Sequence, residues 1–81
     1  MDTRAAVRDF IETELDRKKK FGHLRDTDPL IEMGLIDSMG IQRLLAYLEA
    51  TFSIRIEEEE ILPENFETLE AIVKLLGQKM R

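Results

Sequence analysis

The sequence predicts a small all-α bundle: three main helices, a short third helix before the last one, and a long loop after the first. Apolar residues recur at helical spacing in three separate segments, and the one alternating stretch has no second strand to pair with. Only four Gly and two Pro occur in 81 residues, so long segments can be regular. This length supports one core, and we therefore expect residues 1–81 to form a single domain.

The first helix is predicted over residues 4–18, with Thr3 as its N-cap and Gly22 as a natural stop. Its apolar face consists of Val7, Phe10, Ile11 and Leu15. The segment 21–37 shows no helical period, yet several of its residues are large and apolar: Leu24, Leu30, Ile31, Met33, Leu35 and Ile36. Because a loop of this length is unusual in a small domain, we expect it to lie across the helices and cap their core.

The second helix is predicted from Ser38 to Thr51, because Asp37 and Ser38 are both good N-cap residues. An extended connector over 53–56 and a short helix within 57–66 follow. The last helix should begin after its N-cap, Thr68. Together the helices predict a shared core of Phe10, Ile11, Leu44, Leu45, Leu48, Phe52, Ile72, Val73 and Leu76.

The charge of the chain argues against several kinds of partner. Twelve basic and 17 acidic residues give a net charge of −5, which disfavours nucleic acid as a ligand. Cys is absent, so disulfides and thiolate metal sites are excluded. No apolar run approaches the roughly 20 residues of a membrane span, and the first residues do not resemble a signal peptide. A cytoplasmic location is therefore expected.

The residues do not form a recognisable catalytic or metal site. The one His, His23, lies in the predicted loop, and Ile36 stands where a Gly-x-Ser-x-Gly elbow around Ser38 needs its first Gly. The stretch from Asp26 to Asp37 has the length of a calcium loop, but Ile31 stands where that loop needs Gly. Self-contained hydrolysis and calcium binding are thus both disfavoured.

Asp37 and Ser38 remain as the pair of interest. Taken alone, they need be no more than a helix cap. If Asp37 is the cap, however, Ser38 is the first helical residue and its hydroxyl faces solvent. A phosphate on that oxygen would lie at the positive end of the helix dipole, near unsatisfied N–H groups.

In this context the segment Gly34-Leu35-Ile36-Asp37-Ser38-Met39-Gly40 resembles the attachment motif of acyl and peptidyl carrier proteins. The resemblance extends to Asp28-Pro29-Leu30, to the helix from Ile41 to Phe52, and to the segment 63–68. It implies a four-helix bundle of the acyl-carrier type, in which Ser38 receives 4′-phosphopantetheine from coenzyme A. A separate phosphopantetheinyl transferase would attach the group, and Asp37 would support that modification. The protein would be a carrier and not an enzyme.

The resemblance also implies partners: an adenylating acyl or aminoacyl ligase and downstream acyl-transfer or synthase enzymes, each acting on a monomer. Partners would read the outward positions of the second helix, Met39, Gln42, Arg43 and Ala46. These positions lack the acidic residues typical of fatty-acid carriers, and Ser38-Met39-Gly40 looks more like stand-alone peptidyl and D-alanyl carriers. The cargo is left open between fatty acyl, aminoacyl and other acids. An unmodified helical adaptor that binds protein partners is the alternative.

Overall fold

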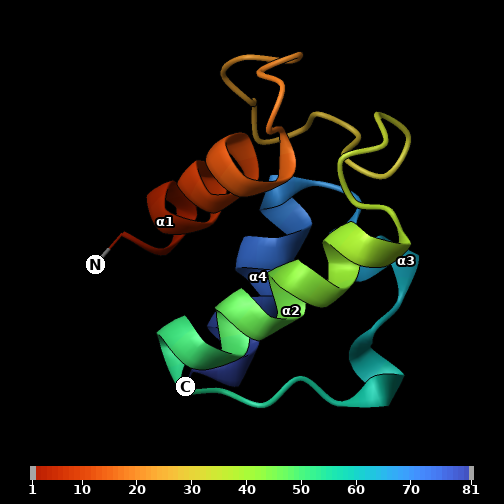
Figure 1. Ribbon diagram of the computed structural model, residues 1–81. Helices are drawn as coiled ribbons and strands as arrows, with labels where there is room; N and C mark the ends of the chain where they lie inside the picture. Colours follow the sequence, from red (N-terminus) through yellow and green to blue (C-terminus); the bar gives the residue numbers. More distant parts are fainter. Residues whose placement is uncertain (1, 81) are drawn as a thin grey trace.

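The computed structural model describes residues 2–80, and within them every regular element is helical. Figure 1 shows α2 crossing in front of α4, with α1 above both. Both α1 and α3 contact α4. The elements, in chain order, are α1 (Thr3–Phe10), a π-helical turn η1 (Ile11–Leu15), α2 (Ser38–Phe52), a 3-10 turn η2 (Glu58–Glu60), α3 (Pro63–Phe66) and α4 (Leu69–Lys79). The predicted small helical bundle is confirmed.

The first helix differs from its predicted boundaries at both ends. Asp2 is the N-cap, since its carboxylate accepts the N–H groups of Arg4 at 3.1 Å and Ala5 at 3.3 Å. The prediction of Thr3 as the cap was therefore wrong: Asp is an equally good cap, and sequence spacing does not choose between neighbouring candidates. At the other end the regular helix gives way to η1 and stops after Leu15, short of the predicted residue 18.

A buried carboxylate explains this early stop. The side chain of Asp16 accepts the N–H groups of Lys20 at 2.9 Å and Phe21 at 3.0 Å, and only 4% of the residue is exposed. These bonds turn the chain back on itself within five residues. Bonds from Phe21 and Lys20 lower the pKa of Asp16 although burial opposes them. The helix thus ends at Asp16, and Gly22, with φ of 68°, lies beyond the turn.

The later elements agree more closely with the sequence. α2 extends one residue past its predicted end, and Ser53 stops it in a left-handed conformation with φ of 54°. The connector after Ser53 is extended as expected, while the short helix predicted within 57–66 is divided into η2 and α3. Thr68 caps α4, because its hydroxyl accepts the N–H of Ala71 at 3.0 Å.

The core includes more of the loop than the helical pattern indicated. Of the nine predicted core residues, five are buried: Ile11, Leu44, Leu48, Ile72 and Leu76. The other four are only half-buried against that core and correct the prediction: Phe10, Leu45, Phe52 and Val73. Loop residues take the central space instead: Leu24, Leu30, Leu35 and Ile36 are all buried. The expectation that the loop caps the core is confirmed.

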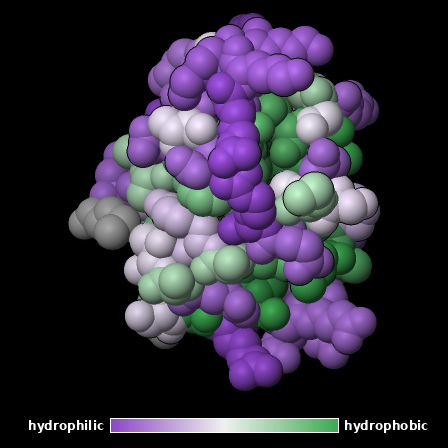
Figure 2. All heavy atoms as spheres, viewed as in Figure 1, coloured by the Kyte–Doolittle hydropathy of each residue, from purple (hydrophilic) through white to green (hydrophobic). Residues whose placement is uncertain are grey.

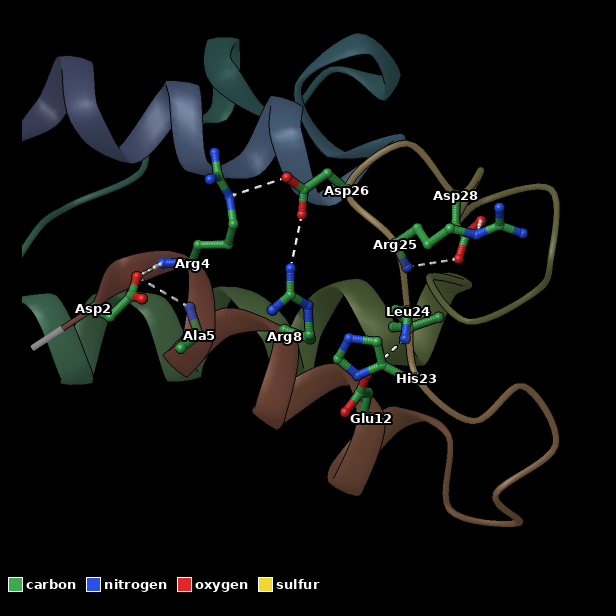
Figure 3. A network of polar contacts seen from close by, with 10 residues as sticks. All are labelled: Asp2, Arg4, Ala5, Arg8, Glu12, His23, Leu24, Arg25, Asp26 and Asp28. Atoms are coloured by element: carbon green, nitrogen blue, oxygen red, sulfur yellow. Dashed lines mark hydrogen bonds and ion pairs between the residues drawn. The ribbon is translucent and has the colours of Figure 1, made fainter.

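Polar bonds fix this loop to the helices on both sides of it. Its backbone is tied to the region before α4 where Leu30 N–H donates to the Glu67 carbonyl at 2.8 Å. The Asp26 carboxylate accepts a hydrogen bond from the guanidinium of Arg8 at 2.8 Å and forms an ion pair with that of Arg4 at 3.4 Å (Figure 3). In the described residues, no helix has the length and apolar character needed to cross a membrane.

Candidate attachment site

Ser38 is the first residue of α2, and its side chain is exposed. Asp37 caps the helix: its Oδ1 accepts the N–H of Gly40 at 2.7 Å, and its carbonyl accepts the N–H of Ile41 at 2.9 Å. In the described part of the chain, the N–H groups of Ser38 and Met39 have no such partner. The hydroxyl of Ser38 therefore lies where the helix dipole and free N–H groups favour a negative charge.

The preceding loop approaches α2 so closely that it requires a residue without Cβ at position 40. A Cβ on Gly40 would lie 2.7 Å from the carbonyl oxygen of Leu35 and 3.1 Å from Oδ1 of Asp37. The loop is itself fixed, because the N–H groups of Leu35 and Ile36 both donate to the carbonyl of Leu30. This packing gives Ser38 a defined position at the end of a rigid helix.

The described residues supply no machinery for chemistry beside Ser38. His23 lies in the loop after η1 with 74% of its side chain exposed, and its Nδ1 is 3.2 Å from the Glu12 carboxylate (Figure 3). Between residues 2 and 80, no three His, Cys, Asp or Glu side chains are grouped to hold a metal ion.

An apolar groove of about 380 Å³ begins at Ser38. Its walls come from the loop before α2, the first turn of α2, and the segment 61–66, which includes α3. Apart from Asp37 and Ser38 its lining is apolar: Ile31, Ile36, Ile41, Ile61, Leu62, Pro63 and Phe66. The sequence-based reasoning missed the wall at 61–66, for which the apolar run after the four Glu residues was the available signal.

The far wall of the groove is held in place from α4. Glu60 Oε1 accepts both Lys79 Nζ at 2.6 Å and the N–H of Glu57 at 2.8 Å. The bond from Lys79 lowers the pKa of Glu60 below its ordinary value, and the bond from the Glu57 N–H acts in the same direction. Asn65 Nδ2 donates to the Glu60 carbonyl at 2.8 Å. The acidic turn is therefore a support for the groove as well as a solvated surface.

The outward positions of α2 are not all alike. Met39 is 76% exposed, and Gln42 and Ala46 are exposed as well. Arg43 is half-buried, because its guanidinium donates to the Glu14 carbonyl at 2.9 Å and to the Glu14 carboxylate at 3.1 Å. The positive charge of Arg43 is therefore paired with Glu14 on this surface. The role of these four positions of α2 in partner binding stays a prediction.

Comparison with known proteins adds two findings. A family model described as "Phosphopantetheine attachment site" matches residues 5–76. A chain from a structure titled "Crystal structure of FAD-dependent dehydrogenase" is 33% identical with a TM-score of 0.79, and the match covers 86% of this chain and 97% of that one. No curated protein sequence matches this chain significantly.

Proposed function

This chain belongs to the family of phosphopantetheine attachment domains, which hold 4′-phosphopantetheine covalently, and from that premise we propose that Ser38 is the attachment residue. We further propose that the protein holds an acyl or aminoacyl group as a thioester on this arm and delivers it to partner enzymes. Carrier domains are not catalysts themselves. The proposal treats residues 1–81 as one carrier domain with no catalytic activity of its own.

The observation that supports Ser38 most strongly is its contrast with Ser53, the other Ser of the chain. Both are exposed, and they flank the same helix at opposite ends. Ser38 lies at the positive end of the helix dipole, whereas Ser53 lies at the negative end, where a phosphodiester is disfavoured. Ser38 also opens onto the apolar groove, which can receive the methyl groups of a pantetheine arm.

The proposed attachment is a phosphoryl transfer onto the Ser38 oxygen. The Ser38 oxygen bonds to the phosphorus that bears pantetheine in coenzyme A. The bond from that phosphorus to the adenosine bisphosphate breaks, and the hydroxyl proton passes to a base on the transferase. We propose that Asp37 supports this modification by capping α2, which holds Ser38 at the first helical position.

The proposed partners are a phosphopantetheinyl transferase, an adenylating acyl or aminoacyl ligase, and downstream acyl-transfer or synthase enzymes that act on a monomer. Because these enzymes use coenzyme A and ATP, we propose a cytoplasmic location. We assign partner recognition to the exposed stripe of Met39, Gln42 and Ala46, with Arg43 beside it.

The decisive experiment is the intact mass of the protein after co-expression with a promiscuous phosphopantetheinyl transferase. We expect the parent and Ser53→Ala to gain one phosphopantetheine each, and Ser38→Ala to gain none while keeping its helical circular dichroism. An unmodified parent would support the helical adaptor instead. A modified Ser38→Ala protein would reject Ser38 as the site.

The solved neighbour suggests one downstream partner in particular. Its title names an FAD-dependent dehydrogenase, yet the matched chain has nearly the length of this helical domain. A domain of this size is more consistent with a dehydrogenase's carrier than with the dehydrogenase. We therefore propose that a flavin enzyme oxidises the tethered group. A base takes the proton from Cα, the flavin takes a hydride from Cβ, and a carbon–carbon double bond forms.

This second proposal can be tested with the dehydrogenase of that crystal structure. A transferase first loads the chain with the butyryl-pantetheine arm of butyryl-coenzyme A. Incubation with the flavin enzyme should then lower the mass of the ejected arm by two hydrogens and bleach the flavin. An unchanged arm mass and flavin spectrum, with the enzyme active on its own carrier, would refute this partner.

A further inference from the structure

Four consecutive basic residues, Arg17 to Lys20, are all exposed in the loop that follows η1. In Figure 1 this loop rises above the end of the first helical segment, and Figure 2 shows hydrophilic residues covering the same place. Lys19 Nζ donates to the Glu12 carbonyl at 3.3 Å, and Lys20 Nζ lies 5.5 Å from the ring centre of Phe21. Within residues 2–80, Arg17 and Lys18 have no ion-pair partner.

The loop that presents these cations is held in shape. The buried Asp16 carboxylate binds the backbone of Lys20 and Phe21, and the Asp16 carbonyl accepts the N–H of Lys19 at 3.0 Å. Lys19 adopts φ of 54°, a conformation that is uncommon for a residue with a Cβ. A rigid basic loop loses less conformational entropy on binding than a mobile one, which suits a docking element.

The contacts between the first two helical segments place this loop toward the end of α2 that begins with Ser38. The Tyr47 ring stacks on Phe10 at 4.2 Å, and one turn nearer the start of α2, Arg43 reaches Glu14. Met39 is the next residue at this spacing toward the start of α2. Facing it, the first helical segment ends at Leu15 and continues into the Arg17–Lys20 loop. Since the chain turns away there, Met39 stays uncovered.

The loop and the start of α2 can fit within a single interface. A standard protein interface buries about 800 Å² on each partner, which corresponds to a patch roughly 30 Å across. The molecule measures 34 × 26 × 21 Å. An enzyme that reaches the arm on Ser38 would therefore cover much of this end of the molecule.

We propose that the Arg17–Lys20 loop docks on an acidic patch of the enzymes that act on the arm, an inference that rests on the proposed carrier function. Four of the 12 basic residues lie in this run, so the rest of the chain carries eight basic and 17 acidic residues and is strongly negative. An anionic membrane or a nucleic acid presents negative charge over a wide area and would repel that remainder. A protein can place a local acidic patch against the loop alone.

The first test is nuclear magnetic resonance titration of the unmodified protein with an oligoglutamate peptide, which imitates an acidic patch. The matched variants are Lys18→Glu in the loop and Lys74→Glu on the exposed face of α4, which change the net charge equally. We expect shifts in residues 16–21 for the parent and for Lys74→Glu, and none for Lys18→Glu. Equal binding by both variants, or tighter binding to phosphatidylglycerol vesicles, would overturn the proposal.

The second test uses the ligase that charges the parent holo-protein. At low salt, Lys18→Glu should lower kcat/KM for loading by about fivefold, and added salt should shrink the difference. Lys74→Glu should load at the parent rate. Equal loading of both variants would refute docking by the loop, while normal phosphopantetheine content by mass would leave the Ser38 assignment intact.

Discussion

Replacing Gly40 with Ala reverses the effect that helix propensity alone predicts. Gly in a helix interior is about 1 kcal/mol less favourable than Ala, so propensity predicts stabilisation. The structure predicts the opposite, because the new Cβ would lie 2.7 Å from the backbone oxygen of Leu35. That oxygen belongs to a loop fixed by its bonds to Leu30 and cannot move freely.

Two costs oppose the propensity gain at this position. Overpacking a fixed site costs about 1–3 kcal/mol. The same Cβ lies 3.1 Å from the capping oxygen of Asp37, and losing a cap costs about 1 kcal/mol. After the gain of about 1 kcal/mol is subtracted, we expect a net loss of about 1–3 kcal/mol. For a domain of this size each kcal/mol lowers Tm by about 4–8 °C.

Gly77 provides the matched control. It lies in α4, is exposed, and has no atom within 4 Å of an added Cβ. Thermal and urea unfolding followed by circular dichroism should show Gly77→Ala slightly more stable than the parent and Gly40→Ala clearly less stable. Phosphopantetheine transfer to Gly40→Ala should also be slower, since Asp37 and Ser38 shift together. If both variants gain stability alike, the close approach of the loop to α2 is wrong.

Three further predictions concern the core, the loop and the outward stripe. Leu48→Ala, at a side chain with 0% exposure, should lower the free energy of unfolding in urea by about 2–5 kcal/mol. Leu62→Ala, at 42% exposure, should change it by less than about 0.5 kcal/mol. Similar urea midpoints for the two variants would contradict the central place of Leu48 in the core. The pKa of Asp16 is lowered by folding, so its ionised side chain stabilises the fold above the ordinary Asp pKa, and this stabilisation is lost as pH falls through the folded value. The difference in unfolding free energy between the parent and Asp16→Asn should therefore narrow below about pH 4, and a difference that stays constant with pH would oppose this reasoning. Met39→Ala should unfold like the parent but load more slowly with the ligase. Met80→Ala, at a Met that is 42% exposed at the end of α4, is the control, and equal loading by both variants would remove Met39 from the docking surface.

The parts that the sequence determined by itself rest on local rules. The apolar period and a strong cap define α2 and α4, because side-chain spacing and capping act within one or two turns. Asp37 and Ser38 could be placed at a helix start for the same reason. The sequence could not decide whether Asp2 or Thr3 caps the first helix, since two adjacent residues with similar capping strength give the same pattern.

Tertiary structure alone decided where the first helix ends, which side chains fill the centre, and what surrounds Ser38. Asp16 stops the helix through bonds to residues that fold back on it, and Leu30 displaces helix residues from the core because the loop is tied to Glu67. The groove that begins at Ser38 has Ile61 in its far wall, and the adjacent Glu60 is held by Lys79, 19 residues later in the chain. Such contacts depend on where distant segments meet, and no local periodicity encodes that meeting.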